Sequence, residues 1–377
     1  MITYRLARPD EREKCIDFIN MVFSVDHEPH NFKTLLPKVY ADDHVLDAAH
    51  FIAVDEAENV RGLVAMLPET LRVLDQELRL GFIGSVSVHP YARGEGHMKA
   101  LVRMAIDDAR ARGFDLLALG GQRQRYEHFG FAPGGASLRF TVTRTNLRHA
   151  LGGADVSELT FLPMREAPEE MVAQAHALHA DQFAHILREP GHFPQILESW
   201  RCTPYILLDG GAFAGYLTAS QDGTPLAELR LIDPARLSRA LQAWMLHKSV
   251  RQVEIELAGY GRKLPAPLCA IAEEWSFSDA LMLNVLNFPR VIECLMWLKR
   301  ALGALPEGET ALFIDGQPLT LHAKGGDVRV LPEAPEDAPR LSAMEAQRRL
   351  FSPLAAQLDP IGFVGALPFH LDKADDF

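Results

Sequence analysis

The spacing of apolar residues changes several times along residues 1–145, and each change predicts a new element. Cys15, Ile16, Ile19 and Val22 recur at the spacing of a helix that is buried on one side. Shorter runs between polar turns alternate apolar and polar residues, which is typical of strands. We therefore expect helices over residues 11–23, 32–40 and 125–129, and strands over residues 3–8, 51–54, 62–66, 71–74, 82–88, 116–119 and 138–144.

One connection in this part of the chain departs from an ordinary turn. The alternating strand that ends at Val88 leads into Pro90, an Arg93–Gly96 loop and a helix that we expect over residues 96–112. Glycine lets the backbone approach a ligand closely, and the first amides of a helix are unpaired at the positive end of its dipole. The stretch therefore predicts a pyrophosphate site to which Arg93 adds a charge, although a simple glycine turn would give the same local pattern.

Residues 155–287 repeat the order of strands and helices, and the last part of the chain changes again. Within the repeat, Leu231–Leu241 echoes the strand, proline, arginine and helix of the first connection but contains no glycine. From residue 288 on, a helix over 291–302 precedes three alternating strands and a helix over 343–351. We expect two mixed-sheet α/β domains in tandem, the second without the cofactor loop, and a small α+β domain. Their expected boundaries are residues 1–145, 146–287 and 288–377.

Composition narrows the class of function. The chain has 377 residues, 48% of them hydrophobic, with no apolar run long enough to span a bilayer and no signal-peptide pattern. Its 4 cysteines are scattered without a CxxC pair, which favours free thiols in a reducing cytoplasm over disulfides or structural zinc. The net charge of -12 disfavours nucleic acid as a partner, because phosphate contacts dominate that affinity, and it suits a cationic substrate such as an amine.

The first unit resembles the GCN5-related N-acetyltransferases (GNAT). Their signature for acetyl-coenzyme A is Arg/Gln-x-x-Gly-x-Gly/Ala, and Arg93-x-x-Gly96-x-Met98 matches its first two anchors and departs at the third. The resemblance implies that Val86 and Val88 offer backbone groups to the pantetheine arm. An amide at Val86 or at its neighbour Ser87 would polarise the thioester carbonyl. The resemblance also implies a pyrophosphate site of consecutive residues, namely Arg93, Gly94, Glu95, Gly96, His97 and Met98.

Over its whole length the chain resembles the enhanced-intracellular-survival (Eis) acetyltransferases. Besides Pro90-x-x-Arg93, the run Arg125–Phe131 matches the Tyr-x-x-Phe-Gly-Tyr/Phe stretch of that family, and the chain ends on an aromatic residue, Phe377, after two acids. The resemblance implies that Tyr126 is the general acid and that the carboxylate of Phe377 is the general base. It further implies a homohexamer and a third unit similar to sterol-carrier-protein domains.

The chemistry of acetyl transfer to an amine fits these roles. An alkylammonium acceptor has a pKa of about 10.4 and must lose a proton before it attacks a thioester, while the departing thiolate must gain one. A free α-carboxyl has a pKa of about 3.5, which burial and the neighbouring Asp375 and Asp376 would raise. We expect an acidic, partly aromatic amine pocket built from Phe23, Asp26, Glu28, Phe32, Phe82, Asp375 and Asp376.

Each of these assignments has an alternative. Tyr126 could be a packing residue in an aromatic stretch, Phe377 a frayed end, and each acid a solvated loop charge. The histidines of His27–His30 and of His176–His179 lack the framework of a metal motif, so we expect no metal. The alternative to an enzyme is a protein that holds an apolar ligand, such as a lipid, in its third unit beside a vestigial first unit; Met98 favours that alternative.

Overall fold

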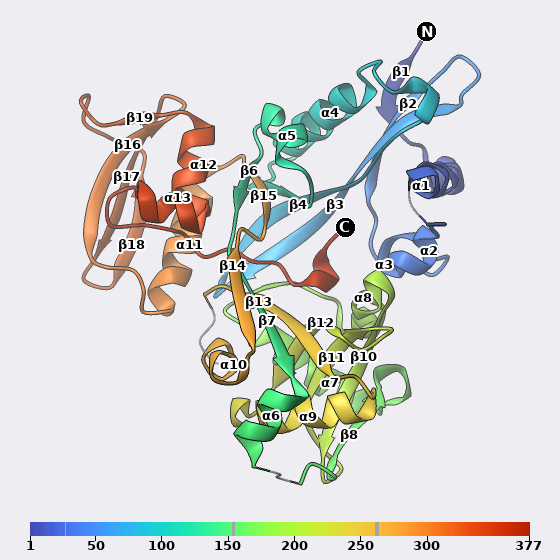
Figure 1. Cartoon of the computed structure of the whole chain (residues 1–377). Coiled ribbons are helices and arrows are strands. Elements are labelled where there is room, and N and C mark those ends of the chain that lie inside the picture. Colours follow the sequence, from blue (N-terminus) through green and yellow to red (C-terminus); the bar gives the residue numbers. More distant parts are fainter. Residues whose placement is uncertain (27, 153–154, 261–263) are drawn as a thin grey trace.

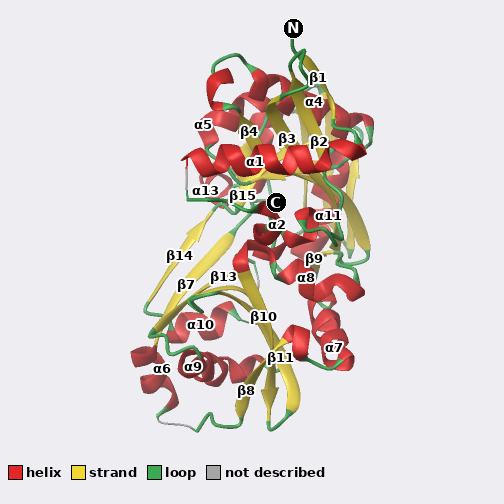
Figure 2. Cartoon of the chain, turned by 90° about the vertical axis from the view of Figure 1, so that its right-hand side faces the viewer, coloured by secondary structure: helices red, strands yellow, loops and turns green. Residues whose placement is uncertain are grey.

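Three β-sheets organise the chain, and the C-terminus lies near the centre of the molecule, between the two larger ones (Figures 1 and 2). The computed structural model describes residues 1–26, 28–152, 155–260 and 264–377. None of the helices in these ranges is long and apolar enough to cross a membrane. The architecture is that of two mixed-sheet α/β units and a smaller α+β unit, so the fold class that the sequence predicts is confirmed.

The first sheet carries helices on both faces. In sheet order its strands are β1 (Thr3–Leu6), β2 (Ala49–Val54), β3 (Val60–Val73), β4 (Gln76–Val88), β5 (Leu116–Leu119), β15 (Leu281–Val285) and β6 (Ala132–Gly134), and β9 (Ala184–Ile186) pairs with β3. Its helices are α1 (Arg12–Asp26), α2 (Phe32–Leu35), α3 (Pro37–Tyr40), α4 (His97–Ala111) and α5 (Arg123–Tyr126). Ile52 and Leu63 face the apolar cluster beneath α1–α3, whereas Phe51 and Val64 face the cluster beneath α4. Both faces of the sheet are therefore buried.

Two sequence expectations for this sheet are wrong in detail. The strands expected over residues 62–66 and 71–74 form one strand, β3, because the polar residue Glu69 between them itself pairs with β4. The helix expected over residues 32–40 is two short helices, since Pro37 lacks the N–H that would continue the first one. Polar residues inside a paired strand and proline at a helix start explain both differences.

The second sheet exchanges strands with the first. In sheet order it contains β14 (Glu274–Ser278), β7 (Ser137–Thr143), β13 (Gln252–Ala258), β12 (Pro225–Leu231), β11 (Ala212–Ser220), β10 (Cys202–Asp209) and β8 (Leu159–Pro163). The strand expected over residues 138–144 as the last of the first unit is β7, and it lies in the second sheet. Conversely, β15 comes from the far end of the second segment and completes the first sheet. Alternation predicts a strand but does not identify its neighbour.

The echo of the first connection forms the predicted strand-to-helix connection in the second unit. The helices here are α6 (Arg144–Leu151), α7 (Glu169–Ala180), α8 (Phe193–Leu197), α9 (Leu237–His247) and α10 (Pro265–Ile271). Strand β12 ends at Leu231, Pro234 opens a single turn, and α9 follows at Leu237. The parallel strands β12 and β13 pair only at their start, as far as Leu226 and Ile255, and then diverge.

The third unit is a small sheet with helices against it. Its strands are β18 (Asp327–Leu331), β17 (Gln317–Lys324), β16 (Gly308–Ile314) and β19 (Arg340–Leu341), and its helices are α11 (Phe288–Ala301), α12 (Ala343–Phe351) and α13 (Pro353–Leu358). The apolar residues of α11 belong to a core that includes both this sheet and the α1 face of the first sheet. The third unit is thereby anchored to the first.

The tail, residues 361–377, runs from the third unit into the space between the two large sheets (Figure 1). The carbonyl of Phe369 accepts a 2.8 Å hydrogen bond from the amide of Ala136, at the start of β7. Farther along, Arg230 of β12 donates to Asp372 at 2.6 Å, before the single turn η8 (Lys373–Asp375) and the last residue, Phe377. The tail is therefore bonded to the second sheet along its course, before its end reaches Gly84 of the first sheet.

Buried charges fix the end of the tail. Arg188, which follows β9, donates two hydrogen bonds to Asp375, at 2.8 and 2.9 Å, and reaches Glu228 of β12 at 3.0 Å. On the other side of η8, the Lys38 ammonium of α3 donates to the carbonyl of Ala374 at 2.7 Å. Burial alone would raise the pKa of Glu228, but the Arg188 guanidinium holds it well below its usual range. One buried cation thus joins three distant segments.

We expect Arg188→Met to destabilise the protein by about 3–5 kcal/mol, because it leaves Glu228 and Asp375 buried without their shared partner. The free energy of unfolding in urea measures this loss. The control is Arg165→Met, whose side chain is 68% exposed in its pair with Glu198 and should change stability by about 1 kcal/mol or less. Equal effects of the two variants would contradict the assigned role of Arg188.

Candidate active site

The loop between β4 and α4 has the geometry that the glycine motif predicts. Gly94 and Gly96 adopt φ values of 87° and 86°, in the left-handed region that glycine enters without strain. A Cβ on either residue would meet no heavy atom within 4 Å, so packing against the protein does not account for these glycines. Gly96 is also the cap of α4, whose first amides face the same loop. The loop is therefore open to a ligand at a helix N-terminus.

Met98 and His97, the residues after Gly96, both pack their side chains against the protein. Met98, the residue that departs from the signature, is half-buried and packs against the apolar cluster beneath α4. His97 is buried and contacts the hydroxyl of Tyr4 at 2.9 Å and the carboxylate of Glu95 at 3.1 Å. The side chain at the third anchor position therefore belongs to the core, and its backbone stays in the first turn of α4.

Strand β4 separates from β5 before it reaches this loop. The two strands are parallel and pair as far as Phe82 and Ala118, whereas β4 continues to Val88. A bulge interrupts its pairing with β3 at the same level, and Ser85 takes a φ of 51° there. The divergence leaves Val86–Val88 beside a gap between parallel strands, at their carboxyl ends. Sheets of this kind bind ligands at that edge.

The last residue of the chain lies on β4 at this point. Phe377 is only 7% exposed, and a Cβ on Gly84 would come within 2.4 Å of its terminal oxygen. Its ring stacks on Tyr40 with centroids 6.0 Å apart, and the Tyr40 hydroxyl contacts Ser85 at 2.9 Å. The C-terminal carboxylate is therefore held beside the bulge rather than frayed.

Two of the aromatic residues expected in the amine pocket, Phe23 and Phe32, belong to a row of rings that ends at Phe377. Phe23 and Phe32 lie 5.1 Å apart, edge to face, and Phe32 lies 5.7 Å from Tyr40, which in turn stacks on Phe377. Phe82 is fully buried in the core beneath α1. Tyr40 joins the row although sequence reasoning missed it, because nothing distinguishes it from the other apolar residues at the end of a predicted helix.

Tyr126 follows β5 in the chain, after the short connection of residues 120–122. It terminates α5, and its ring packs on Gly121 so closely that a Cβ there would be 2.5 Å from it. Burial raises the pKa of Tyr126, so its hydroxyl stays protonated at neutral pH. Tyr126 thus follows β5 in the chain, whereas Phe377 lies against β4, just beyond the point where β4 stops pairing with β5.

The acids expected from the first unit lie apart from this core. Asp26 ends α1, and its side chain falls outside the part of the chain that the structure describes, as does His27. Glu28 is exposed and pairs at 2.9 Å with Arg201 of the second unit. This ion pair joins the loop after α1 to the single turn η6 (Ser199–Arg201).

The two acids of the tail differ from each other. Asp375 is buried and its carboxylate is taken by Arg188, so it is engaged in the fold. Asp376 pairs with Lys373 at 2.6 Å, and burial raises the pKa of Asp376. Asp376 lines a cavity of about 480 Å³, and Asp375 lines a different one of about 320 Å³.

The cavity that Asp376 lines lies between the tail and the second sheet. Its wall includes the carboxylates of Asp376, Glu254 and Glu256 together with Trp200 of η6 and Lys373 of η8. Acidic and aromatic groups are thus collected next to the residue that precedes Phe377. Sequence reasoning missed the three residues of the second unit, because only the fold brings them to the tail.

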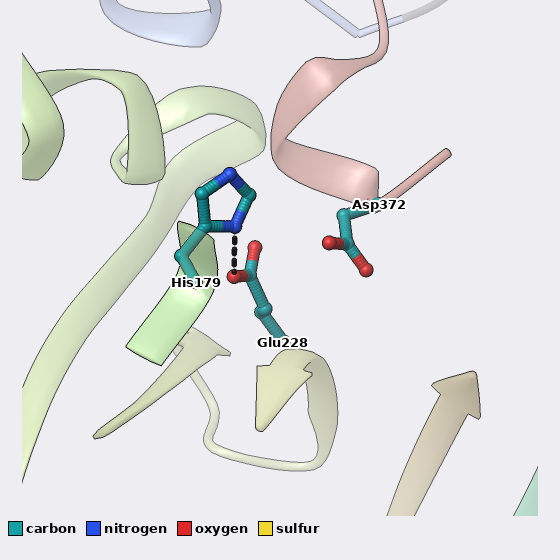
Figure 3. A group of neighbouring side chains, drawn as sticks. All are labelled: His179, Glu228 and Asp372. Atoms are coloured by element: carbon teal, nitrogen blue, oxygen red, sulfur yellow. Dashed lines mark ion pairs between the residues drawn. The ribbon is translucent and has the colours of Figure 1, made fainter. Parts of the chain in front are cut away.

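A group of three side chains has the spacing of a metal site. His179, Glu228 and Asp372 offer ligand atoms within 4.8 Å of one another (Figure 3). However, Arg188 lies 3.0 Å from Glu228 and Arg230 lies 2.6 Å from Asp372. Two guanidinium groups already neutralise these carboxylates and would repel a cation, so we assign the group to the buried charge network.

The histidines of the 176–179 stretch are used by the backbone. His176 contacts the carbonyl of Arg188 through Nε2 at 2.7 Å, and His179 contacts the carbonyl of Ile186 in the same way at 2.9 Å. These contacts hold the segment that presents Arg188. Their role is positional.

Comparison with known proteins agrees with this geometry. Residues 3–134 match the family described as acetyltransferase (GNAT) domain, the range that contains β4, the glycine loop and Tyr126. None of the curated proteins matches the sequence. The chain therefore carries an acetyltransferase domain of the GNAT type and is an enzyme.

Three solved structures cover 100% of the chain and share its fold. A probable N-acyltransferase from Enterococcus faecalis has a TM-score of 0.69 at 15% identity, with 100% of that chain covered. A GCN5-related N-acetyltransferase from Kribbella flavida has a TM-score of 0.65 at 17% identity, with 98% covered. Eis1 from Mycobacterium abscessus has a TM-score of 0.63 at 14% identity, with 100% covered. The complete arrangement of tandem mixed-sheet units and a third unit is thus one that these proteins share.

We expect Gly84→Ala to expel the end of the chain, because the added Cβ would lie 2.4 Å from the terminal oxygen of Phe377. The rate at which a carboxypeptidase releases Phe377 measures this change and should rise at least tenfold. Gly191→Ala is the control, since a Cβ there meets nothing within 4 Å. If both variants release Phe377 as slowly as the wild type, the carboxylate does not depend on close approach to β4.

Proposed function

We propose that the protein is an acetyl-coenzyme A-dependent N-acetyltransferase that acts on a primary amine of a cationic acceptor. The acceptor classes are an aminoglycoside-like, polyamine-like or lysine-like amine. The observation that carries the proposal is the burial of the C-terminal carboxylate against Gly84, on the strand that leads to the open glycine loop of an acetyltransferase domain. A tail that served only the fold would not need its charged end at this position.

The residues that would hold coenzyme A fit it. Amides at the start of α4 and the open Gly94–Gly96 backbone suit a pyrophosphate. Arg93, directly before Gly94, would add a positive charge. The unpaired side of β4 at Val86–Val88 suits the amides of a pantetheine arm. Acetyl-coenzyme A supplies the acetyl group as a thioester. An amide at Val86 or Ser87, beside the bulge, would stabilise negative charge on its carbonyl oxygen.

The carboxylate of Phe377 is the proposed general base. It would take the proton from the acceptor ammonium directly or through water, and a buried carboxylate holds a proton more readily than an exposed one. Tyr126 is the proposed general acid, since its raised pKa keeps the proton that the departing thiolate needs. In this proposal Phe377 serves the acceptor amine and Tyr126 serves the departing thiolate.

The acceptor would enter by the acidic, aromatic side of the tail. Phe23 and Phe32 would form its apolar wall, and Asp376 would supply negative charge beside it. Asp26, at the end of α1, and Glu28, in the loop after it, are the other acids proposed to contact the acceptor. The net charge of -12 favours the approach of a cation. Asp375, held by Arg188, would act by keeping the tail in place.

The remaining parts of the proposal concern the other units and the environment. We assign residues 1–145 as the catalytic unit, 146–287 as its degenerate copy and 288–377 as a sterol-carrier-protein-like unit that delivers the tail. A cytoplasmic homohexamer completes the proposal, and light scattering tests the assembly.

Converting the carboxylate of Phe377 to a carboxamide by semisynthesis should lower turnover by about a hundred- to ten-thousand-fold. The change removes the proton acceptor and keeps both the ring and the chain length. Thiol release from acetyl-coenzyme A with a panel of polyamines, aminoglycosides and lysyl peptides measures turnover, and calorimetry measures coenzyme A affinity. Semisynthetic protein with the natural carboxylate is the control. Full turnover by the carboxamide would remove the carboxylate from the mechanism.

Tyr126→Phe should lower kcat by a similar factor and leave coenzyme A affinity within about twofold, because only the hydroxyl is removed from a ring that packs on Gly121. Steady-state kinetics with a saturating acceptor gives kcat. Tyr91→Phe is the matched control, since Tyr91 is 88% exposed. A kcat equal to that of the control variant would return Tyr126 to a packing role.

A further inference from the structure

In the cavity beside the tail, the ammonium group of Lys373 lies against the aromatic ring of Trp200. Trp200 of η6 forms part of the cavity wall, and the adjacent residues Trp200 and Arg201 both adopt left-handed backbone angles, with φ of 62° and 57°. Such conformations are unfavourable for residues other than glycine and persist only where the surroundings fix them. Here the ion pair of Arg201 with Glu28 ties the turn to the first unit. The fold thus fixes the turn that places the Trp200 indole at the cavity.

The ammonium of Lys373 makes two contacts in this cavity. Its Nζ lies 4.3 Å from the centroid of the Trp200 ring and 2.6 Å from a carboxylate oxygen of Asp376. An aromatic face and a carboxylate are the two groups that recognise an alkylammonium ion. The Lys373 side chain is nevertheless 49% exposed, so it can leave for solvent without unburying a large apolar surface.

We propose that Lys373 is a tethered competitor of the acceptor amine. Its Nζ fills an ammonium subsite made of Trp200 and Asp376, and a cationic acceptor binds there only after Lys373 has moved out. The inference rests on the proposed function, because it places the acceptor in this cavity. Asp376, which forms the subsite, directly precedes Phe377, whose carboxylate is the proposed base.

A further carboxylate favours exchange of one cation for another. Glu254 and Glu256 of β13 both line the cavity, but Arg139, also in its wall, pairs with Glu256 at 2.9 Å. Glu254 is therefore the group that adds negative charge for the ammonium that replaces Lys373. Because the competitor is part of the chain, its effective concentration is in the millimolar range, and it selects against acceptors that bind weakly. Competition by Lys373 therefore raises the KM for an acceptor with a single positive charge and leaves kcat, which reports the chemical step, unchanged.

A purely structural role of Lys373 makes the opposite prediction. Lys373 and Asp376 are three residues apart around the turn η8, and their ion pair could serve only to brace the tail. In that case removing Lys373 would loosen Asp376 and weaken binding of any cation. A competitor, once removed, strengthens it.

The test uses tetramethylammonium chloride as the probe, because aromatic faces recognise this cation and its nitrogen carries no hydrogen that an acetyl group could replace. Calorimetric titration of full-length Lys373→Met should give an affinity about tenfold higher than that of the wild type, as expected if Lys373 fills the subsite about nine-tenths of the time. The double variant Lys373→Met/Trp200→Leu should lose this gain. Lys324→Met, at the end of β17 in the third sheet, should bind like the wild type. Equal or weaker binding by Lys373→Met overturns the proposal.

A second measurement uses the wild type alone and does not depend on a variant that folds. An amine-acylating reagent in limiting amount should label Lys373 several times faster when tetramethylammonium is present, relative to Lys324 in the same sample. Unchanged relative labelling overturns the proposal.

Kinetics then separates this inference from the proposed function. With n-butylamine as the acceptor, Lys373→Met should lower KM about tenfold and keep kcat within about twofold. Tighter tetramethylammonium binding without turnover of any amine would support the subsite and refute the acetyltransferase mechanism. Turnover of an amine with unchanged KM and unchanged tetramethylammonium binding would support the acetyltransferase mechanism and refute the subsite.

Discussion

The structure depends on one buried guanidinium. Arg188 is held between Glu228 of the second sheet and Asp375 of the tail, with all three side chains at most 2% exposed. Isolated charges of this kind are costly to bury, and they are tolerated only when each is paired and hydrogen-bonded. Arg188 satisfies both acids at once. Charge pairing at Asp375, together with apolar packing of Ala374 and Phe377, therefore holds the end of the tail inside the molecule, at a distance from the third unit.

Exchange of strands supplies the rigid frame for this pairing. Strand β7 leaves the first unit for the second sheet, β15 returns to the first sheet, and β9 pairs with β3 just before Arg188. Because each sheet contains strands from both sides of the expected boundaries, the two sheets hold a fixed relation to each other. The tail, hydrogen-bonded to the second sheet through Asp372, can then place its terminal carboxylate against Gly84 of the first sheet.

The sequence predicts the parts of this arrangement that have a local cause. The periodic spacing of apolar residues predicts strand β4 and helix α4, and the glycines predict the turn between them, where Gly94 and Gly96 have positive φ. The connection at Leu231–Leu241 is predicted from its apolar spacing in the same way. The choice of partner strands is not predicted, because alternation is the same for β7 in either sheet. Tyr40 and Arg188 also escape notice, since a lone tyrosine and a loop arginine are usually exposed and only distant segments bury them here.

The two large units solve the same geometric problem in different ways. In each, a pair of parallel strands diverges after a few paired residues, β4 from β5 and β12 from β13. The first divergence leads to a glycine loop with open space around it, whereas the second leads to a connection without glycine and has the tail lying against β12. In the second unit, Arg230 of β12 instead contacts Asp372 of the tail, and Glu228 of the same strand pairs with Arg188, which binds Asp375. The connection without glycine thus leaves β12 as the strand that holds the tail.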